Sequence, residues 1–90
     1  MSKNKIRLVV VTTGEDIEEE FNINEPLRVV KMRALAKEQP GANPELFHLE
    51  FNDQTLDDSM KIEDYIQQYG WADGTVLELV SQPEVVNGDQ

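Results

Sequence analysis

The chain has few residues suited to covalent or metal-dependent chemistry. It contains no cysteine, which excludes thiolate nucleophiles, disulfides and cysteine-based metal sites. His48 is its one histidine, so multi-histidine metal centres are excluded and acid–base catalysis has only weak support. No serine or threonine stands in a recognisable nucleophile setting, and no glycine-rich phosphate-binding loop is present. We therefore expect a protein that is not an enzyme and that uses no cofactor or metal.

Carboxylates dominate the ionisable side chains. The 90 residues include 18 Asp and Glu against 8 Lys and Arg, which gives a formal net charge of −10. This charge opposes binding to nucleic acid and to anionic membrane surfaces. Five of the acidic residues lie between Glu15 and Glu20, where either a solvated hairpin or a site for a basic partner or divalent cation fits. We favour the solvated hairpin, because the ligand spacing of an EF-hand loop is missing.

The size and the apolar content predict one small globular domain. Apolar residues make up 39% of the chain and charged residues 29%, a balance that is typical of folded proteins. The apolar stretch from Ile6 to Val11 is too short for a signal peptide, and no run approaches the ~20 residues of a membrane span. We expect a cytoplasmic protein.

Alternating apolar residues predict several strands. The segment from Ile6 to Thr12 is apolar and β-branched, and Ile17 to Ile23 alternates, so the two are expected to form a hairpin. Glu19 falls on the apolar face of the second strand unless a bulge or a longer turn moves it out. Further strands are expected over residues 47–51, 54–56 and 75–80.

One helix is predicted, over residues 27–38. Asn24 is a suitable N-cap, Pro26 suits the first turn, and Pro40 with Gly41 ends the helix. Its apolar residues form two rows that lie almost opposite each other, Leu27, Val30, Ala34 and Val29, Met32, Ala36. Periodicity alone does not say which row faces the core.

The order of these elements predicts an α+β domain with the helix on one face of a mixed sheet of four or five strands. Residues 57–70 are interpreted as a connection, with Met60, Ile62, Tyr65 and Ile66 as its apolar members. The folded domain is expected over residues 1–80, followed by a flexible C-terminal tail at 81–90, which is polar and interrupted by proline.

The chain from Lys5 to about Val80 resembles ubiquitin and its relatives, the β-grasp family. Segments in the matching order carry the resemblance: Thr13-Gly14 in the hairpin, Leu27, Val30, Lys31 and Ala34 in the helix, Pro40 to Phe51 with Leu56, Ile62-Glu63-Asp64-Tyr65, and Thr75 to Val80. It implies that the row beginning at Leu27 faces the sheet and that Tyr65 braces a loop by bonding to its backbone. It also implies that Lys31 is a buried ion-pair partner.

The outer face of the sheet departs from ubiquitin, which presents an apolar patch there to its receptors. This chain offers His48 and Glu50 at the corresponding strand, and Val80 is the remaining apolar member. Burying the Glu50 carboxylate without a partner would cost about 1–3 kcal/mol or more. We expect the usual binders of ubiquitin not to bind, and we assign partner contacts to His48, Glu50 and Val80.

Two further positions are candidates for partner contacts. The resemblance implies that Val29, Met32 and Ala36 face away from the sheet, and an exposed apolar stripe commonly marks an interface. We assign partner contacts to Val29 and Met32. Trp71 has two interpretations, a cap on the rim of the core or an anchor for a partner, and we favour the cap.

The C-terminus is the second departure, because ubiquitin and its sulfur-carrier relatives end in Gly-Gly. Here a single Gly88 is followed by Asp89 and Gln90. Bacterial ubiquitin-like modifiers that resemble this chain often carry one glycine and a short removable tail. The resemblance implies trimming after Gly88 by a processing peptidase, then conjugation by activating and conjugating enzymes.

The alternative is that Asn87-Gly88 is a turn-forming dipeptide in a frayed terminus. The protein is then a non-conjugated interaction module or a small subunit of a multiprotein assembly. Either way we expect a monomer in isolation whose partners are proteins.

Overall fold

The first two strands form the predicted hairpin in this computed structural model, which describes residues 4–81. Strand β1 (Lys5–Val11) pairs antiparallel with β2 (Asp16–Asn22), and both lie within one residue of their predicted bounds. Every residue of β1 has one partner in β2, so no bulge interrupts the pairing. Glu19, opposite Leu8, therefore stays on the inner face of the sheet.

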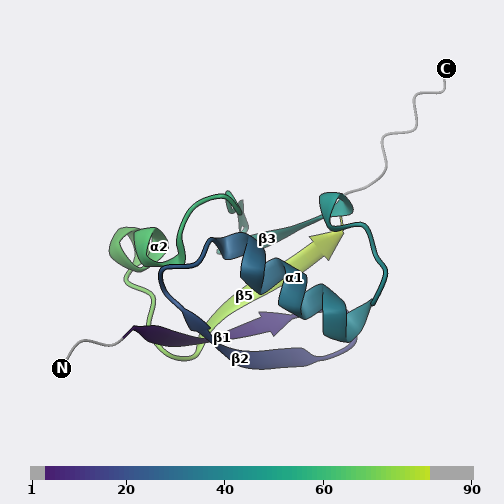
Figure 1. Ribbon diagram of the computed structural model, residues 1–90, viewed down its shortest axis with the longest axis horizontal. Coiled ribbons are helices and arrows are strands. Elements are labelled where there is room, and N and C mark those ends of the chain that lie inside the picture. The colour runs from purple at the N-terminus through teal and green to yellow at the C-terminus, as the bar shows by residue number, and fades with distance from the viewer. Residues whose placement is uncertain (1–3, 82–90) are drawn as a thin grey trace, which may run out of the picture.

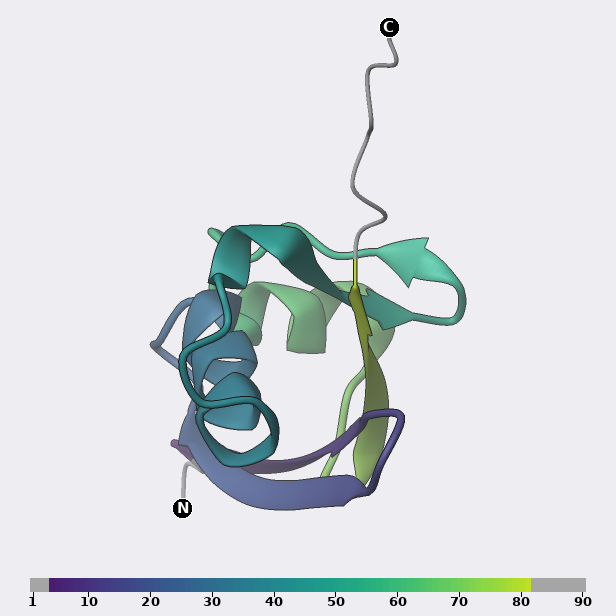
Figure 2. The ribbon, with the colours of Figure 1, turned by 90° about the vertical axis from the view of Figure 1, so that its right-hand side faces the viewer.

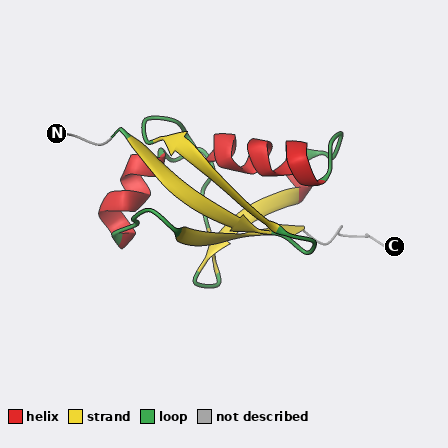
Figure 3. Ribbon diagram, turned by 90° about the horizontal axis from the view of Figure 1, so that it is seen from below, coloured by secondary structure: helices red, strands yellow, loops and turns green. Residues whose placement is uncertain are grey.

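Five strands make one mixed sheet in the order β2-β1-β5-β3-β4 (Figures 1 and 2). Strand β5 (Thr75–Ser81) lies at its centre, parallel to β1 and antiparallel to β3 (Phe47–Phe51). The short strand β4 (Gln54–Thr55) pairs with the end of β3. The sheet is curved, and the helices lie on one side of it, the inner face (Figures 2 and 3).

Helix α1 (Leu27–Glu38) packs across the inner face of the sheet and has the predicted bounds. Leu27, Val30 and Ala34 are no more than 1% exposed, so the row implied by the resemblance does face the core. The core also takes in apolar residues from every strand except β4: Ile6, Leu8, Val10, Ile17, Phe21, Leu49 and Leu77. The helix thus closes one side of the apolar interior.

The predicted N-cap of α1 is wrong. Pro26, not Asn24, stands directly before the helix, and no side chain within residues 4–81 caps the first turn. Instead, the backbone N–H groups of Leu27 and Arg28 donate to the carbonyl oxygens of Met60 and Asp58, each at 2.8 Å. Two orphan donors of the helix end are therefore satisfied by a loop thirty or more positions away in the chain.

A second helix, α2 (Ile62–Tyr69), occupies much of the segment interpreted above as a connection, so the prediction of a single helix is wrong. Its Ile62 and Tyr65 are buried, and Gly70 ends it in the left-handed conformation at φ 73°. A 3₁₀ turn (Pro44–Leu46) before β3 was also not predicted. Within residues 4–81, no helix has the length and apolarity needed to cross a membrane.

Candidate interaction surfaces

The outer face of the sheet brings together the three residues predicted there. His48 and Glu50 alternate with buried Leu49 on β3, so both point away from the core. Val80 of β5 lies directly opposite His48. The position opposite Glu50 is Glu78, which places two carboxylates face to face across neighbouring strands.

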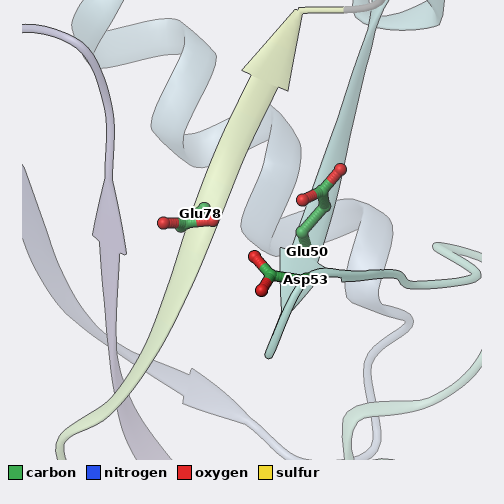
Figure 4. Close-up of side chains that lie close together, drawn as sticks. All are labelled: Glu50, Asp53 and Glu78. Atoms are coloured by element: carbon green, nitrogen blue, oxygen red, sulfur yellow. The ribbon is translucent and has the colours of Figure 1, made fainter.

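Asp53 completes a cluster of three carboxylates with Glu50 and Glu78, which we call the acidic trio (Figure 4). One oxygen from each group lies within 4.8 Å of the others. Asp53 reaches β5 because the turn after β3 runs through two residues of positive φ, Asn52 at 53° and Asp53 itself at 66°. Such backbone suits Asn and Asp better than other residues with side chains.

The acidic trio holds concentrated negative charge. Among residues 4–81, no Lys or Arg forms an ion pair with any of its members. Within the described residues, the acidic trio contacts His48, whose Nε2 lies 2.7 Å from an oxygen of Glu50. The acidic trio therefore gives this face of the sheet a strongly negative potential.

Sequence reasoning missed Asp53 and Glu78 as members of this surface. Asp53 follows Glu50 by three positions in the turn after the strand, whereas Glu78 is distant in sequence and is close to Glu50 only once the strand order is known. The pairing of β3 with β5 is the signal, because it sets Glu50 opposite Glu78. That register follows from the fold and cannot be read from either strand alone.

The outward face of α1 carries the second pair of predicted contact residues. Met32 is 45% exposed and Ala36 is also exposed, as expected. Val29 is only half-buried, because part of its side chain packs against the core. A shallow hollow of about 440 Å³ follows this face and is lined by Arg28, Val29, Met32, Arg33 and Ala36.

On the inner face of the sheet, the carboxylate of Glu19 is paired with two cations of α1. The carboxylate of Glu19, 15% exposed, accepts hydrogen bonds from Lys37 Nζ at 2.8 Å and Arg33 Nη1 at 2.7 Å. These contacts, that of Lys37 first, lower the pKa of Glu19 against the opposing effect of burial. The interpretation of the acidic hairpin as solvated therefore holds for its exposed neighbours but not for Glu19.

Lys31 is the buried ion-pair partner that the resemblance implies. It is 6% exposed, and its Nζ lies 2.7 Å from Asp58 and donates to the carbonyl oxygen of Phe47 at 3.3 Å. The same loop is braced by Tyr65, whose hydroxyl oxygen accepts from the Asp57 N–H at 2.8 Å, as predicted. Asp57 in turn binds the hydroxyl and N–H of Ser59, and these bonds lower its pKa.

Trp71 is part of the hydrophobic core. It is 5% exposed and stacks on Tyr65 with ring centroids 5.3 Å apart, while Phe51 meets it edge-on at 5.4 Å. Tyr69 of α2 completes this aromatic group. The favoured interpretation of Trp71 as a cap on the core is confirmed.

The predicted conjugation site, Gly88, lies outside the described residues, as does most of the predicted tail. The described chain ends at Ser81, the last residue of β5. Met1 to Lys3 also lie outside.

No protein-family model and no curated protein matches this sequence. Solved structures do match it. The ubiquitin of Caldiarchaeum subterraneum is 22% identical with a TM-score of 0.72, over 93% of this chain and 99% of that one. A protein designed on the basis of ubiquitin is 20% identical with a TM-score of 0.72, over 98% and 100%.

A third match comes from a structure described as "Molecular Mimicry of SUMO promotes DNA repair". It is 17% identical with a TM-score of 0.72, over 89% of this chain and 95% of that one. Identities this low show the fold alone. They confirm the predicted fold class: the chain has the ubiquitin-like β-grasp fold.

Proposed function

We propose that this chain is a non-enzymatic ubiquitin-like modifier, trimmed after Gly88 and conjugated through that residue. The observation that carries the proposal is the ubiquitin-like body that runs to Ser81 at the end of β5, with Gly88 seven residues beyond. Seven extended residues span at most about 25 Å, which is enough to carry a terminal carboxylate away from the folded body. The tail over 81–90 is thus the functional end of the protein.

The chemistry needs one cut and one activation. A peptidase hydrolyses the bond between Gly88 and Asp89, which releases Asp89-Gln90 and leaves a glycine carboxylate. An activating enzyme joins that carboxylate to the adenylyl group of ATP and releases pyrophosphate. A conjugating enzyme then transfers the acyl group from the adenylate to an amine of the target, which forms an amide bond and releases AMP and a proton. Glycine suits these steps because it has no side chain to obstruct a narrow active site.

The partners in this scheme differ from those of ubiquitin. The acidic trio and His48 occupy the outer sheet face, so a receptor with an aliphatic surface would bury carboxylates without partners there. We propose that partners contact His48, Glu50 and Val80 and that the usual ubiquitin receptors do not. The resemblance further suggests a bacterial protein that acts in the cytoplasm as a monomer.

A second candidate is a ubiquitin-like interaction module that is never conjugated, or a small subunit of a larger assembly. The sequence around Gly88 favours it, because Gly88 stands between Asn87 and Asp89 and no Gly-Gly pair occurs in the sequence. Both candidates use the same folded body. They differ in what happens to its C-terminus.

The deciding experiment is mass spectrometry of the N-terminally tagged chain recovered from its native cells. The modifier predicts chains that end at Gly88 and adducts in which Gly88 is joined to amines of target proteins. Gly88→Val is expected to abolish the adducts, whereas Asn87→Ala, the matched control beside it, retains them. Recovery of only intact chains ending at Gln90 would refute the modifier and favour the interaction module.

A further inference from the structure

Positive charge is concentrated on α1. Of the eight Lys and Arg residues in the chain, four lie on this helix, which has a single acidic residue, Glu38. Three of the four have partners on the inner side: Lys31 binds Asp58, and Arg33 and Lys37 both bind Glu19. The fourth, Arg28, is exposed and forms no side-chain ion pair among residues 4–81.

The basic residues border the apolar hollow on the outward face of α1. At 100° per residue, Met32, Ala36 and Val29 form one strip along the helix, with Arg28 on one side of it and Arg33 on the other. These five residues line the hollow of about 440 Å³. A partner surface complementary to this face would carry an apolar strip with carboxylates on both sides of it.

Arg33 retains binding capacity despite its contact with Glu19. Only its Nη1 bonds to the Glu19 carboxylate, and its side chain is 49% exposed. A guanidinium has five N–H donors, so several remain for a second carboxylate. Arg28 offers all of its side-chain donors, and its backbone N–H is already held by Asp58.

We propose that this face of α1 docks an acidic amphipathic helix of a partner protein. The apolar residues of that helix lie along Met32, Ala36 and Val29, and carboxylates on its two flanks bind Arg28 and Arg33. The hollow follows the helix axis, which suits ridge-into-groove packing of a second helix. The inference goes beyond the modifier proposal, because the docking site does not involve Gly88.

Other occupants fit the surface less well. Nucleic acid would bring phosphates to the two arginines but would be repelled by a chain of net charge −10. A second copy of this chain is also a poor occupant, because two copies of charge −10 repel each other. A separate acidic helix needs only local attraction and apolar contact.

The test places a photo-crosslinking amino acid at Met32 in the full chain, in its native cells, and identifies the attached peptide by mass spectrometry. The expected peptide comes from another protein and has an acidic amphipathic helical sequence. Gln68, exposed on α2, carries the crosslinker in the control. Because Met32 is exposed, the replacement should fold, and a second crosslinking variant at Ala36 repeats the test.

The attached sequence is then synthesised and its affinity is measured by fluorescence anisotropy. Arg28→Glu is expected to weaken binding about tenfold or more, and Arg28→Lys by less, with stronger binding at low salt. Arg28 is used rather than Arg33 because Arg33 also holds Glu19 in the folded body. An unchanged thermal midpoint for Arg28→Glu shows that the fold is intact.

Several outcomes would overturn the inference: attachment to a second copy, to nucleic acid, or to a basic or non-helical segment, and attachment no greater than at Gln68. Equal affinity for Arg28→Glu and the parent chain would do the same. Repeating the crosslink in the Gly88→Val chain separates the two proposals. If the crosslink still forms in the Gly88→Val chain, docking on α1 does not depend on conjugation through Gly88.

Discussion

The two faces of the sheet treat carboxylates in opposite ways. On the inner face, Glu19 meets two cations on α1 and stays charged beside the core. On the outer face, Glu50 and Glu78 lie opposite each other with Asp53 beside them. Glu19 is partly buried and must be neutralised within the fold, whereas solvent screens the exposed Asp53 and Glu78. Glu50 is half-buried and contacts His48. Glu19 therefore contributes to stability, whereas the acidic trio leaves negative charge on the outer face of the sheet.

The largest expected effect comes from removing Lys31, the buried charged residue of α1. Lys31→Ala removes the cation that binds Asp58 and leaves a space against the 3₁₀ turn and β3. The loss should be about 2 kcal/mol in the free energy of unfolding, because the packing of the buried Lys31 side chain is lost and the partly buried Asp58 is left without its cation. Urea denaturation followed by circular dichroism measures it.

The matched control is Lys61→Ala, at an exposed lysine whose Nζ lies 3.9 Å from Glu63. Its effect should stay below about 0.5 kcal/mol. Equal losses for the two lysine variants would mean that burial does not distinguish their ion pairs. The proposed difference between buried and exposed charges would then be wrong.

The second effect concerns Glu19 and pH. Glu19→Gln keeps the shape of the side chain but removes its charge, and should lower the free energy of unfolding by about 1 kcal/mol at neutral pH. The folded state lowers the pKa of Glu19, so its stabilisation is complete above the usual glutamate pKa and disappears as pH falls through the lower, folded value.

Denaturation of both chains between neutral pH and about pH 2 tests the sign of this effect. The difference in stability between the parent chain and Glu19→Gln should shrink steadily as the solution becomes acidic. A difference that grows on acidification would contradict the assignment. Glu18→Gln, on the exposed side of the same strand, is the control.

The smallest expected effect has the opposite sign. Glu78→Lys replaces one member of the acidic trio by a cation opposite Glu50, and should raise the free energy of unfolding by up to about 0.5 kcal/mol. The gain should fall at high salt, where both repulsion and attraction between exposed charges are screened. A loss of stability in the Lys variant would show that the acidic trio has a structural role.

Local patterns predicted most of the fold. Local sequence patterns placed all five strands within one residue of their observed bounds, and the run of helix formers gave α1. Helix α2 was missed, although Ile62, Tyr65, Ile66 and Tyr69 follow helical spacing. A helix of eight residues is not stable by itself and forms because Ile62 and Tyr65 pack into the core.

The candidate sites were less predictable, because they depend on contacts between distant segments. Asn24 has the right side chain for an N-cap, but carbonyl groups of Asp58 and Met60 take that role once the chain folds back. The acidic trio needs both the strand register and the positive φ of Asp53. Neither the register nor that backbone conformation has a signal in a single strand.

The parallel pairing of β1 and β5 has a mechanical consequence. Lys5 begins β1 and Ser81 ends β5, at opposite ends of two neighbouring strands that run in the same direction. A pull on these two residues slides the strands past each other and loads the bonds between Leu8–Val11 and Thr75–Glu78 all at once. Such a ladder breaks as a unit rather than bond by bond. The body should therefore resist being pulled apart from its ends more strongly than its small size suggests.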